Sequence, residues 1–245
     1  MPEPISIDPP FRVARPVIRQ SWLELTFLHW AYDPAVVRPL IPAGLELDLW
    51  EGRIYVGLVP FILDDITATR APAVPWLSRF NETNLRTYVR DGQGRRGVWF
   101  FSLDAARLAA VVGARASYSL PYWWAKMSVE QEGGRVAYRS RRRHGPPGMT
   151  DIVVRPGEEV AEPSELEAFL TARWRLFSER GGRLYVADVE HPRWPLRRVR
   201  VERLEQTLLQ AAGLPAPEGE PLAHFSPGTR VLTGWPRPVD GEREI

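Results

Sequence analysis

Residues 82–104 read ETNLRTYVRDGQGRRGVWFFSLD, and this stretch decides the fold class. Its two outer parts, Glu82–Arg90 and Gly97–Asp104, are rich in the β-branched and aromatic residues that favour extended backbone. The polar segment DGQGRR between them contains the glycines that a tight turn needs. The pattern therefore predicts two antiparallel strands joined by a turn.

Similar short strands are predicted on both sides of this pair. Upstream lie WLELTFLHWAY, then LELDLW and RIYVGLVPFIL, with Glu51-Gly52 predicting a hairpin between the last two. Downstream, Ser117–Glu130 predicts a strand, and Glu132-Gly133-Gly134 turns it into RVAYRSRRR. The sequence thus indicates an α+β chain dominated by curved, predominantly antiparallel sheet. Its high tryptophan content favours a sheet that closes into a barrel around side chains.

Few helices are expected. Ala105–Val112 fits a short one, and Ser164–Arg180 reads as a longer amphipathic helix that Ser164 caps. The proline-containing segment Thr67–Phe80 reads as a long loop. No repeat or internal linker divides the chain, so we expect one domain over residues 1–245, with residues 1–20 as an extended N-terminal arm.

Composition excludes several classes of function. The chain carries 32 Lys and Arg against 30 Asp and Glu, and this near-neutral balance predicts no nucleic-acid binding. No apolar run approaches the roughly 18 residues that cross a bilayer, so we expect no membrane partner. The N-terminus lacks a signal-peptide pattern, and the cytoplasm is the expected location. The absence of cysteine excludes thiol chemistry. No phosphate loop, dinucleotide motif or metal-ligand spacing occurs, so no cofactor and no metal are expected.

Alternation along the predicted strand 82–90 places Glu82, Asn84, Arg86 and Tyr88 on one face. Two interpretations are open. The polar face is either the solvated side of a sheet or the lining of a pocket inside a barrel. In a pocket, Glu82 and Arg86 would be placed to orient a small acid or a carbonyl compound.

Lys126 is the only lysine in the sequence. The same alternation places it on one strand face with Tyr122 and Trp124. Burial against aromatic walls disfavours a charged ammonium, and a neutral amine is what Schiff-base chemistry requires. The alternative is a lysine at the strand end, with its stem on the aromatic rings and its amine in water.

The blocks WLELTFLHW, VVRPLIPAGLELDLWEGRIYVGLVPF, FNETNLRTYV, GVWFFSLDA, LPYWWAKM, LTARWRLFS and HFSPG occur in this order. Together they resemble the bacterial YqjF-like family, and the resemblance runs from about Arg19 to Trp235. That family is similar in fold to acetoacetate decarboxylase, a curved sheet wrapped into a barrel around a polar pocket.

The resemblance also implies a chemistry. In acetoacetate decarboxylase, a lysine of a Gly-Phe-Pro-Lys-Lys motif forms an imine with the substrate. Glutamates and an arginine of the pocket help to position the substrate. Glu82 falls where one such glutamate would lie. Aligned on Pro121, however, the reactive lysine falls at Tyr122, and Lys126 lies four residues further on.

Three functional hypotheses follow. The first is a small-molecule pocket protein that acts on a small oxo-acid or carbonyl compound, with Lys126 and Glu82 as catalytic residues in a decarboxylase-like lyase. Its substrate-binding residues would be Arg86, Tyr88, Tyr122 and Trp124. The second is a non-catalytic binder that holds its ligand with aromatic side chains. The third is a scaffold or regulatory protein.

Overall fold

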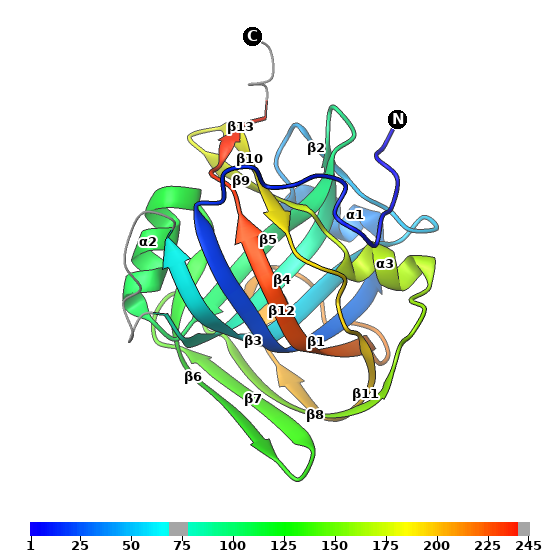
Figure 1. Cartoon of the computed structure of the whole chain (residues 1–245), viewed down its shortest axis with the longest axis vertical. Coiled ribbons are helices and arrows are strands. Elements are labelled where there is room, and N and C mark those ends of the chain that lie inside the picture. Colours follow the sequence, from blue (N-terminus) through cyan, green and yellow to red (C-terminus); the bar gives the residue numbers. More distant parts are fainter. Residues whose placement is uncertain (69–77, 240–245) are drawn as a thin grey trace.

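A computed structural model describes residues 1–68 and 78–239, and these residues form a 13-stranded sheet with a few short helices (Figure 1). The strands are β1 (Ile18–Tyr32), β2 (Leu45–Leu47), β3 (Ile54–Ala68), β4 (Phe80–Asp91), β5 (Arg96–Ala105), β6 (Tyr122–Glu132), β7 (Arg135–Arg142), β8 (Met149–Glu159), β9 (Arg175–Arg180), β10 (Arg183–Glu190), β11 (Arg197–Gln206), β12 (Leu222–Thr233) and β13 (Arg237–Pro238). The helices are α1 (Pro34–Val37), the 3-10 helix η1 (Arg38–Leu40), α2 (Leu108–Tyr118), α3 (Glu165–Thr171) and α4 (Leu208–Ala211).

The sheet closes on itself by two routes. One circuit runs β4-β5-β6-β7-β8-β11-β12-β1-β3 and returns to β4. A second runs β5-β9-β10-β12-β1-β3-β4 and returns to β5, because β9 pairs with β5 and β10 pairs with β12. The pairings are antiparallel except those of β5 with β6 and of β5 with β9. The predicted α+β barrel of mostly antiparallel sheet is therefore confirmed.

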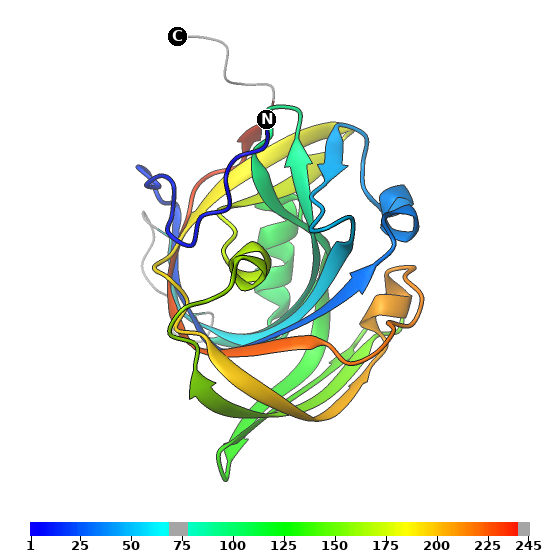
Figure 2. The ribbon, with the colours of Figure 1, turned by 90° about the vertical axis from the view of Figure 1, so that its right-hand side faces the viewer.

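Two helices lie at opposite ends of this barrel. Figure 2 looks along it, with α3 in front of the near opening and α2 behind it at the far end. Of α2, only Val111 and Tyr118 are buried, whereas Leu108 and Val112 are exposed. The helix thus contributes its C-terminal residue Tyr118 to the interior and leaves much of its length in solvent.

The residues before β1 lie along the outside of the barrel (Figure 1). Three ion pairs attach them: Glu3 with Arg175 at 2.6 Å, Asp8 with Arg193 at 2.5 Å, and Arg12 with Glu190 at 2.7 Å. The partners Arg175 and Glu190 belong to β9 and β10, so this segment lies against the second circuit.

The predicted helix Ser164–Arg180 is wrong over its second half. Its start is as expected, because Ser164 and Glu167 form a capping box. The helix ends at Thr171, however, and Arg175–Arg180 is strand β9. Residues 167–178 are buried on all sides, which a helix with one solvated face does not allow. As a strand, the segment completes the backbone hydrogen bonding of β5 and forms a hairpin with β10 at Gly181-Gly182.

Other boundaries also differ. LELDLW pairs with β4 instead of forming a hairpin with β3, and around Glu51-Gly52 only Trp50 and Arg53 form a bridge. The predicted strand Ser117–Glu130 begins later, at Tyr122, because α2 continues to Tyr118. Most of the predicted loop Thr67–Phe80 lies outside the described residues.

Candidate functional site

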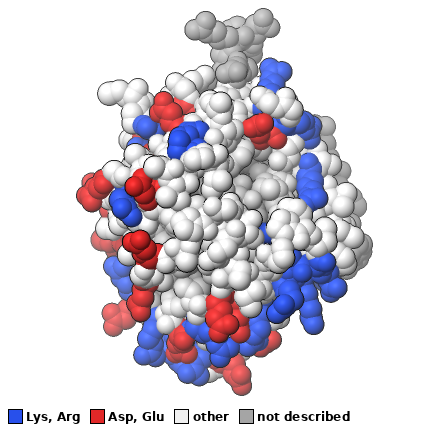
Figure 3. Space-filling view, turned by 180° about the vertical axis from the view of Figure 1, so that it is seen from behind, with Lys and Arg blue, Asp and Glu red and all other residues white. Residues whose placement is uncertain are grey.

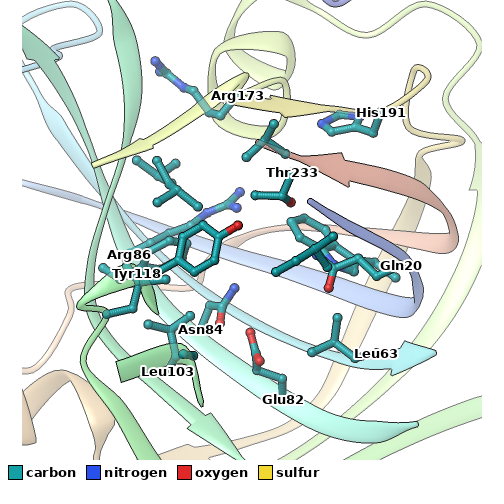
Figure 4. Close-up of a pocket in the computed structure, with 18 of the residues that line it drawn as sticks. Gln20, Leu63, Glu82, Asn84, Arg86, Leu103, Tyr118, Arg173, His191 and Thr233 are labelled. Carbon is teal, nitrogen blue, oxygen red and sulfur yellow. The ribbon is translucent and has the colours of Figure 1, made fainter. Parts of the chain in front are cut away.

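A cavity of about 120 Å³ lies inside the second circuit, between β4 and β5 on one side and β9, β10 and β12 on the other. Many of its side chains are apolar, among them Trp22, Phe100 and Leu120. Figure 4 shows polar groups that project between them from several elements. The polar and phenolic lining residues are Gln20, Glu82, Asn84, Arg86, Tyr118, Tyr122, Thr171, Arg173, Arg175, His191 and Thr233.

The polar face of β4 is buried and lines this cavity. Glu82, Asn84 and Arg86 alternate along the strand, each is at most 6% exposed, and all three point inward (Figure 4). The interpretation of this face as the solvated side of a sheet is therefore wrong. Tyr88, the next residue on the face, is fully buried outside the lining, where it donates to the carbonyl of Leu170 at 2.6 Å.

Glu82 forms a hydrogen-bonded pair with Tyr122. The phenol of Tyr122 donates to Oε2 of Glu82 at 2.9 Å. Burial, together with the negative charge of Asp104, raises the pKa of Glu82 to about 8, although the hydrogen bond from Tyr122 acts in the opposite direction. Burial and the neighbouring carboxylate likewise raise the pKa of Tyr122 well above its usual value. At neutral pH the pair therefore holds a protonated carboxyl group beside a phenol, which is a proton donor in an apolar setting.

Arg86 is a buried cation that no described carboxylate neutralises. Its guanidinium donates a long 3.4 Å hydrogen bond to the carbonyl of Leu170 and interacts with the phenol of Tyr88, and its Nε has no partner within the described residues. The rings of Phe27 and Tyr88 lie 5.6 and 5.9 Å from its Cζ. A buried charge is costly unless it is paired, so this guanidinium is a strong candidate to bind an anion.

The other two arginines of the cavity already have partners. Arg173 contacts Asp48 at 2.6 Å. Arg175 contacts Glu3 at 2.6 Å and Asp188 at 3.4 Å. Among the described cavity residues, Arg86 therefore supplies the positive charge that protein carboxylates leave unpaired.

Four further polar atoms of the lining residues lack hydrogen-bond partners in the described part of the chain. They are the donors Nε1 of Trp22, Nη2 of Arg173 and Nε of Arg175, and the acceptor Oδ1 of Asn84. Buried polar groups in folded proteins are nearly always hydrogen-bonded. Unsatisfied groups at a cavity wall, together with Nε of Arg86, are typical of a site that a polar ligand completes.

Lys126 and Trp124 lie elsewhere. Strand β6 pairs with β5 only from Tyr122 to Trp124, and beyond that point it pairs only with β7 among the described strands, forming the β6–β7 ribbon (Figure 1). Lys126 lies in this ribbon, opposite Arg141, and is exposed. Trp124 is partly buried outside the cavity, with the guanidinium of Arg143 4.6 Å above its ring.

The structure therefore brings together Glu82, Arg86 and Tyr122, and it places Tyr88, Trp124 and Lys126 outside the lining. Sequence reasoning did not single out His191, Arg173 or Trp22. His191 directly follows β10, Arg173 lies in the α3–β9 connection, and Trp22 belongs to β1. No local motif marks them, because only the closure of the second circuit makes them neighbours.

The face in Figure 3 carries side chains of both charges. Acidic and basic groups alternate along its left and lower edges, and basic groups lie together at the lower right. Several arginines of the outer strands have carboxylate partners: Glu202 contacts Arg135 at 2.5 Å and Arg155 at 2.9 Å, and Glu130 contacts Arg139 at 3.0 Å. That the chain does not bind nucleic acid stays a prediction, and these pairs support it.

Neither a metal cluster nor a membrane-crossing helix occurs in the described ranges. No three His, Asp or Glu side chains of residues 1–68 and 78–239 are grouped so that they could hold a metal ion. The longest described helix, α2, has 11 residues, and no described helix has the length and apolarity to cross a bilayer.

Solved structures of small-molecule enzymes share this architecture. The enduracididine biosynthesis enzyme MppR, solved with the condensation product of pyruvate and imidazole 4-carboxaldehyde, matches with a TM-score of 0.65 and 14% identity, over 94% of this chain and 92% of its own. Acetoacetate decarboxylase from Legionella pneumophila matches with a TM-score of 0.61 and 15% identity, over 98% and 92% of the two chains. The fold is therefore that of the acetoacetate decarboxylase-like proteins.

The chain belongs to the DUF2071 family, described as "Uncharacterized conserved protein (COG2071)", whose model matches residues 19–230. It is also 36% identical over 222 residues to "Uncharacterized protein YqjF" of Bacillus subtilis (strain 168), covering 90% of this chain and 91% of that protein. The resemblance to the YqjF-like family is thus confirmed.

Proposed function

We propose that the cavity binds a small carboxylic acid, with Arg86 as the counter-ion of its carboxylate and the Glu82–Tyr122 pair as a proton donor to its other end. The observation that carries this proposal is the buried guanidinium of Arg86, which no described carboxylate neutralises. A planar guanidinium binds a carboxylate through parallel hydrogen bonds, and burial strengthens the attraction.

The spacing on β4 fits a ligand with two functional groups. Glu82 and Arg86 lie four residues apart on an extended strand, so their Cα atoms are about 13 Å apart, with Asn84 between them. Because both side chains reach into the cavity, the space between their ends suits a molecule of a few carbon atoms. A carbonyl or hydroxyl oxygen at its far end would meet the protonated carboxyl group of Glu82.

Proton transfer is the chemistry that these groups support. A protonated Glu82 polarises a carbonyl oxygen or protonates a developing enolate, and Tyr122 stabilises the carboxylate that remains. MppR has been solved in complex with pyruvate, a small oxo-acid, which supports this class of ligand. No covalent step involves a lysine amine, because Lys126, the one lysine of the sequence, is exposed outside the cavity.

A binding protein without turnover is the second candidate. It is favoured because no lysine occurs among the described residues that line the cavity, and because Trp22, Phe100 and Leu120 form apolar walls. Both candidates predict binding at Arg86. They differ in whether the bound acid exchanges a carbon-bound proton with solvent, which NMR in deuterium oxide measures directly.

Binding itself is tested with acids and their matched amides. We expect small carboxylic acids to raise the melting temperature of the protein and the corresponding amides to have little effect, since only the acids carry a charge for Arg86. Arg86→Gln should abolish the rise. Arg141→Gln, which changes an exposed arginine of β7, should leave it intact. Equal shifts for acids and amides would contradict the proposal.

A further inference from the structure

His191 is held rigidly at the wall of the cavity. It follows the last residue of β10, is 3% exposed, and lines the cavity (Figure 4). Its imidazole lies between the indoles of Trp174 and Trp194, with ring centroids 4.5 Å away in each case. A ring packed in this way has one orientation, so the atoms that it presents to the cavity are fixed.

The position of the proton on this ring follows from its partner. Nδ1 of His191 lies 2.7 Å from the carbonyl oxygen of Pro192. A carbonyl oxygen only accepts hydrogen bonds, so Nδ1 carries the hydrogen and Nε2 carries the lone pair. Burial, with a smaller effect from the charge of Arg86, lowers the pKa of His191 to about 4 despite the opposing hydrogen bond to Pro192, so the ring is neutral at pH 7.

The lone pair of Nε2 has no hydrogen-bond partner within residues 1–68 and 78–239. The neighbouring indoles cannot supply one, because their N–H groups are already used. Nε1 of Trp174 donates to the carbonyl of Ser6 at 3.1 Å, and Nε1 of Trp194 donates to the carbonyl of Thr171 at 3.0 Å. His191 therefore offers a free acceptor nitrogen at the cavity wall, to which a ligand can donate.

We propose that Nε2 of His191 accepts a hydrogen bond from a hydroxyl group of the ligand, so that the site selects hydroxy acids over acids that lack the hydroxyl. The inference rests on the proposed function, since the carboxylate of the same ligand occupies Arg86. A keto oxygen offers no donor to Nε2. An ammonium group would donate but would bring a second positive charge into a cavity where Arg86 is already unpaired.

The test compares acids that differ in one group. Titration calorimetry on the wild-type protein uses lactate, pyruvate and propanoate, and then 3-hydroxybutanoate, acetoacetate and butanoate. Within at least one series we expect the hydroxy acid to bind about five- to tenfold more tightly than its deoxy analogue, the effect of one buried hydrogen bond. His191→Phe keeps an aromatic ring between the two indoles and removes the acceptor. It should abolish the preference and leave the affinity for the deoxy acid within about twofold.

His144→Phe, which alters an exposed histidine outside the cavity, is the matched control and should keep the preference. A preference that survives in His191→Phe, or no preference in the wild type, would overturn the inference while acid binding at Arg86 still stands. If none of these acids binds, or if Arg86→Gln binds them as well as the wild type does, the proposed function fails first.

A second measurement needs no variant. In protein labelled with ¹⁵N-histidine, the Nε2 resonance of His191 should move upfield when the hydroxy acid is added, because an unprotonated ring nitrogen is sensitive to a new donor. The deoxy acid should leave it in place. A resonance that shows a protonated Nε2 in the free protein would contradict the assigned tautomer and with it the inference.

Discussion

The phenol of Tyr122 donates a 2.9 Å hydrogen bond to Oε2 of Glu82 and so connects β6 to β4 at the wall of the cavity. The two residues are 40 positions apart in the sequence. Glu82 is buried and Tyr122 partly buried, so Glu82 keeps its proton near neutral pH, and the phenol fixes the direction in which the carboxyl group points. Arg86, on the same strand, supplies a buried guanidinium group.

Glu82 should make stability depend on pH. Its pKa rises from 4.5 in the unfolded chain to about 8 in the fold, so the folded state binds the proton more tightly. The contribution therefore favours folding below about pH 4.5 and is lost as pH rises to about 8. At about 1.4 kcal/mol for each pKa unit, the whole loss is on the order of 5 kcal/mol. Urea unfolding of the wild type and Glu82→Gln between pH 5 and pH 8 measures it.

We expect Glu82→Gln to show a much flatter profile, because the amide keeps an acceptor for Tyr122 and does not ionise. Glu130→Gln changes an exposed carboxylate on the β6–β7 ribbon and should reproduce the wild-type slope. If Glu82→Gln lost stability with pH as steeply as the wild type, the carboxyl group would be ionised at neutral pH, and it could not serve as the proton donor.

Arg86→Met should stabilise the ligand-free protein. The substitution removes a buried charge that has no described carboxylate partner and replaces it with a side chain suited to the rings of Phe27 and Tyr88. We expect an increase of about 1 to 3 kcal/mol in the free energy of unfolding, together with loss of acid binding. Chemical denaturation measures the first effect and calorimetry the second. A variant that is destabilised by more than about 3 kcal/mol would show that Arg86 supports the fold.

Lys126→Arg should leave ligand binding unchanged. Lys126 is exposed on the ribbon beyond the barrel wall, and it is the only lysine in the chain. Incubation with pyruvate or acetoacetate followed by borohydride should give no adduct on the peptide that contains it, as read by intact mass and peptide mapping. A stable adduct on Lys126 that disappears in Lys126→Arg would restore the imine hypothesis and place the chemistry outside the cavity described above.

Gly97 should be intolerant of a side chain. A Cβ atom there would lie 2.6 Å from Cε2 of Phe177 and 2.8 Å from the carbonyl oxygen of Arg175, where β5 and β9 close the second circuit. Gly97→Ala should cost about 1 to 3 kcal/mol of stability and weaken ligand binding. Gly113→Ala, in open space on α2, should be neutral or stabilising by up to about 1 kcal/mol. Thermal unfolding of both variants tests the importance of this closure.

Period-two patterns predicted the strands well, because alternation along a strand is a local property. The face that carries Glu82, Asn84 and Arg86 could be written down from residues 82–90 alone, and all three line the cavity. The segment 164–180 could not be predicted correctly. Its helical period is real over its first half, but the choice between helix and strand after Thr171 depends on β5, which is distant in sequence.

The errors in the predicted site also come from strand pairings between residues that are distant in sequence. Alternation placed Tyr122, Trp124 and Lys126 on one strand face, yet only Tyr122 lines the cavity. Lys126 lies beyond Trp124, where β6 no longer pairs with β5. His191 could not be identified from the sequence. It reaches the cavity through the pairing of β10 with β12, which no local pattern reveals.

A crystal structure of the protein with a bound small hydroxy acid tests the central claim most directly. The account predicts the ligand inside the second circuit, with its carboxylate within hydrogen-bond distance of the guanidinium of Arg86 and Glu82 facing its other end. The same ligand should be absent from crystals of Arg86→Gln grown and soaked alike. A ligand seated elsewhere on the protein, or one in the cavity with its carboxylate turned away from Arg86, would contradict it.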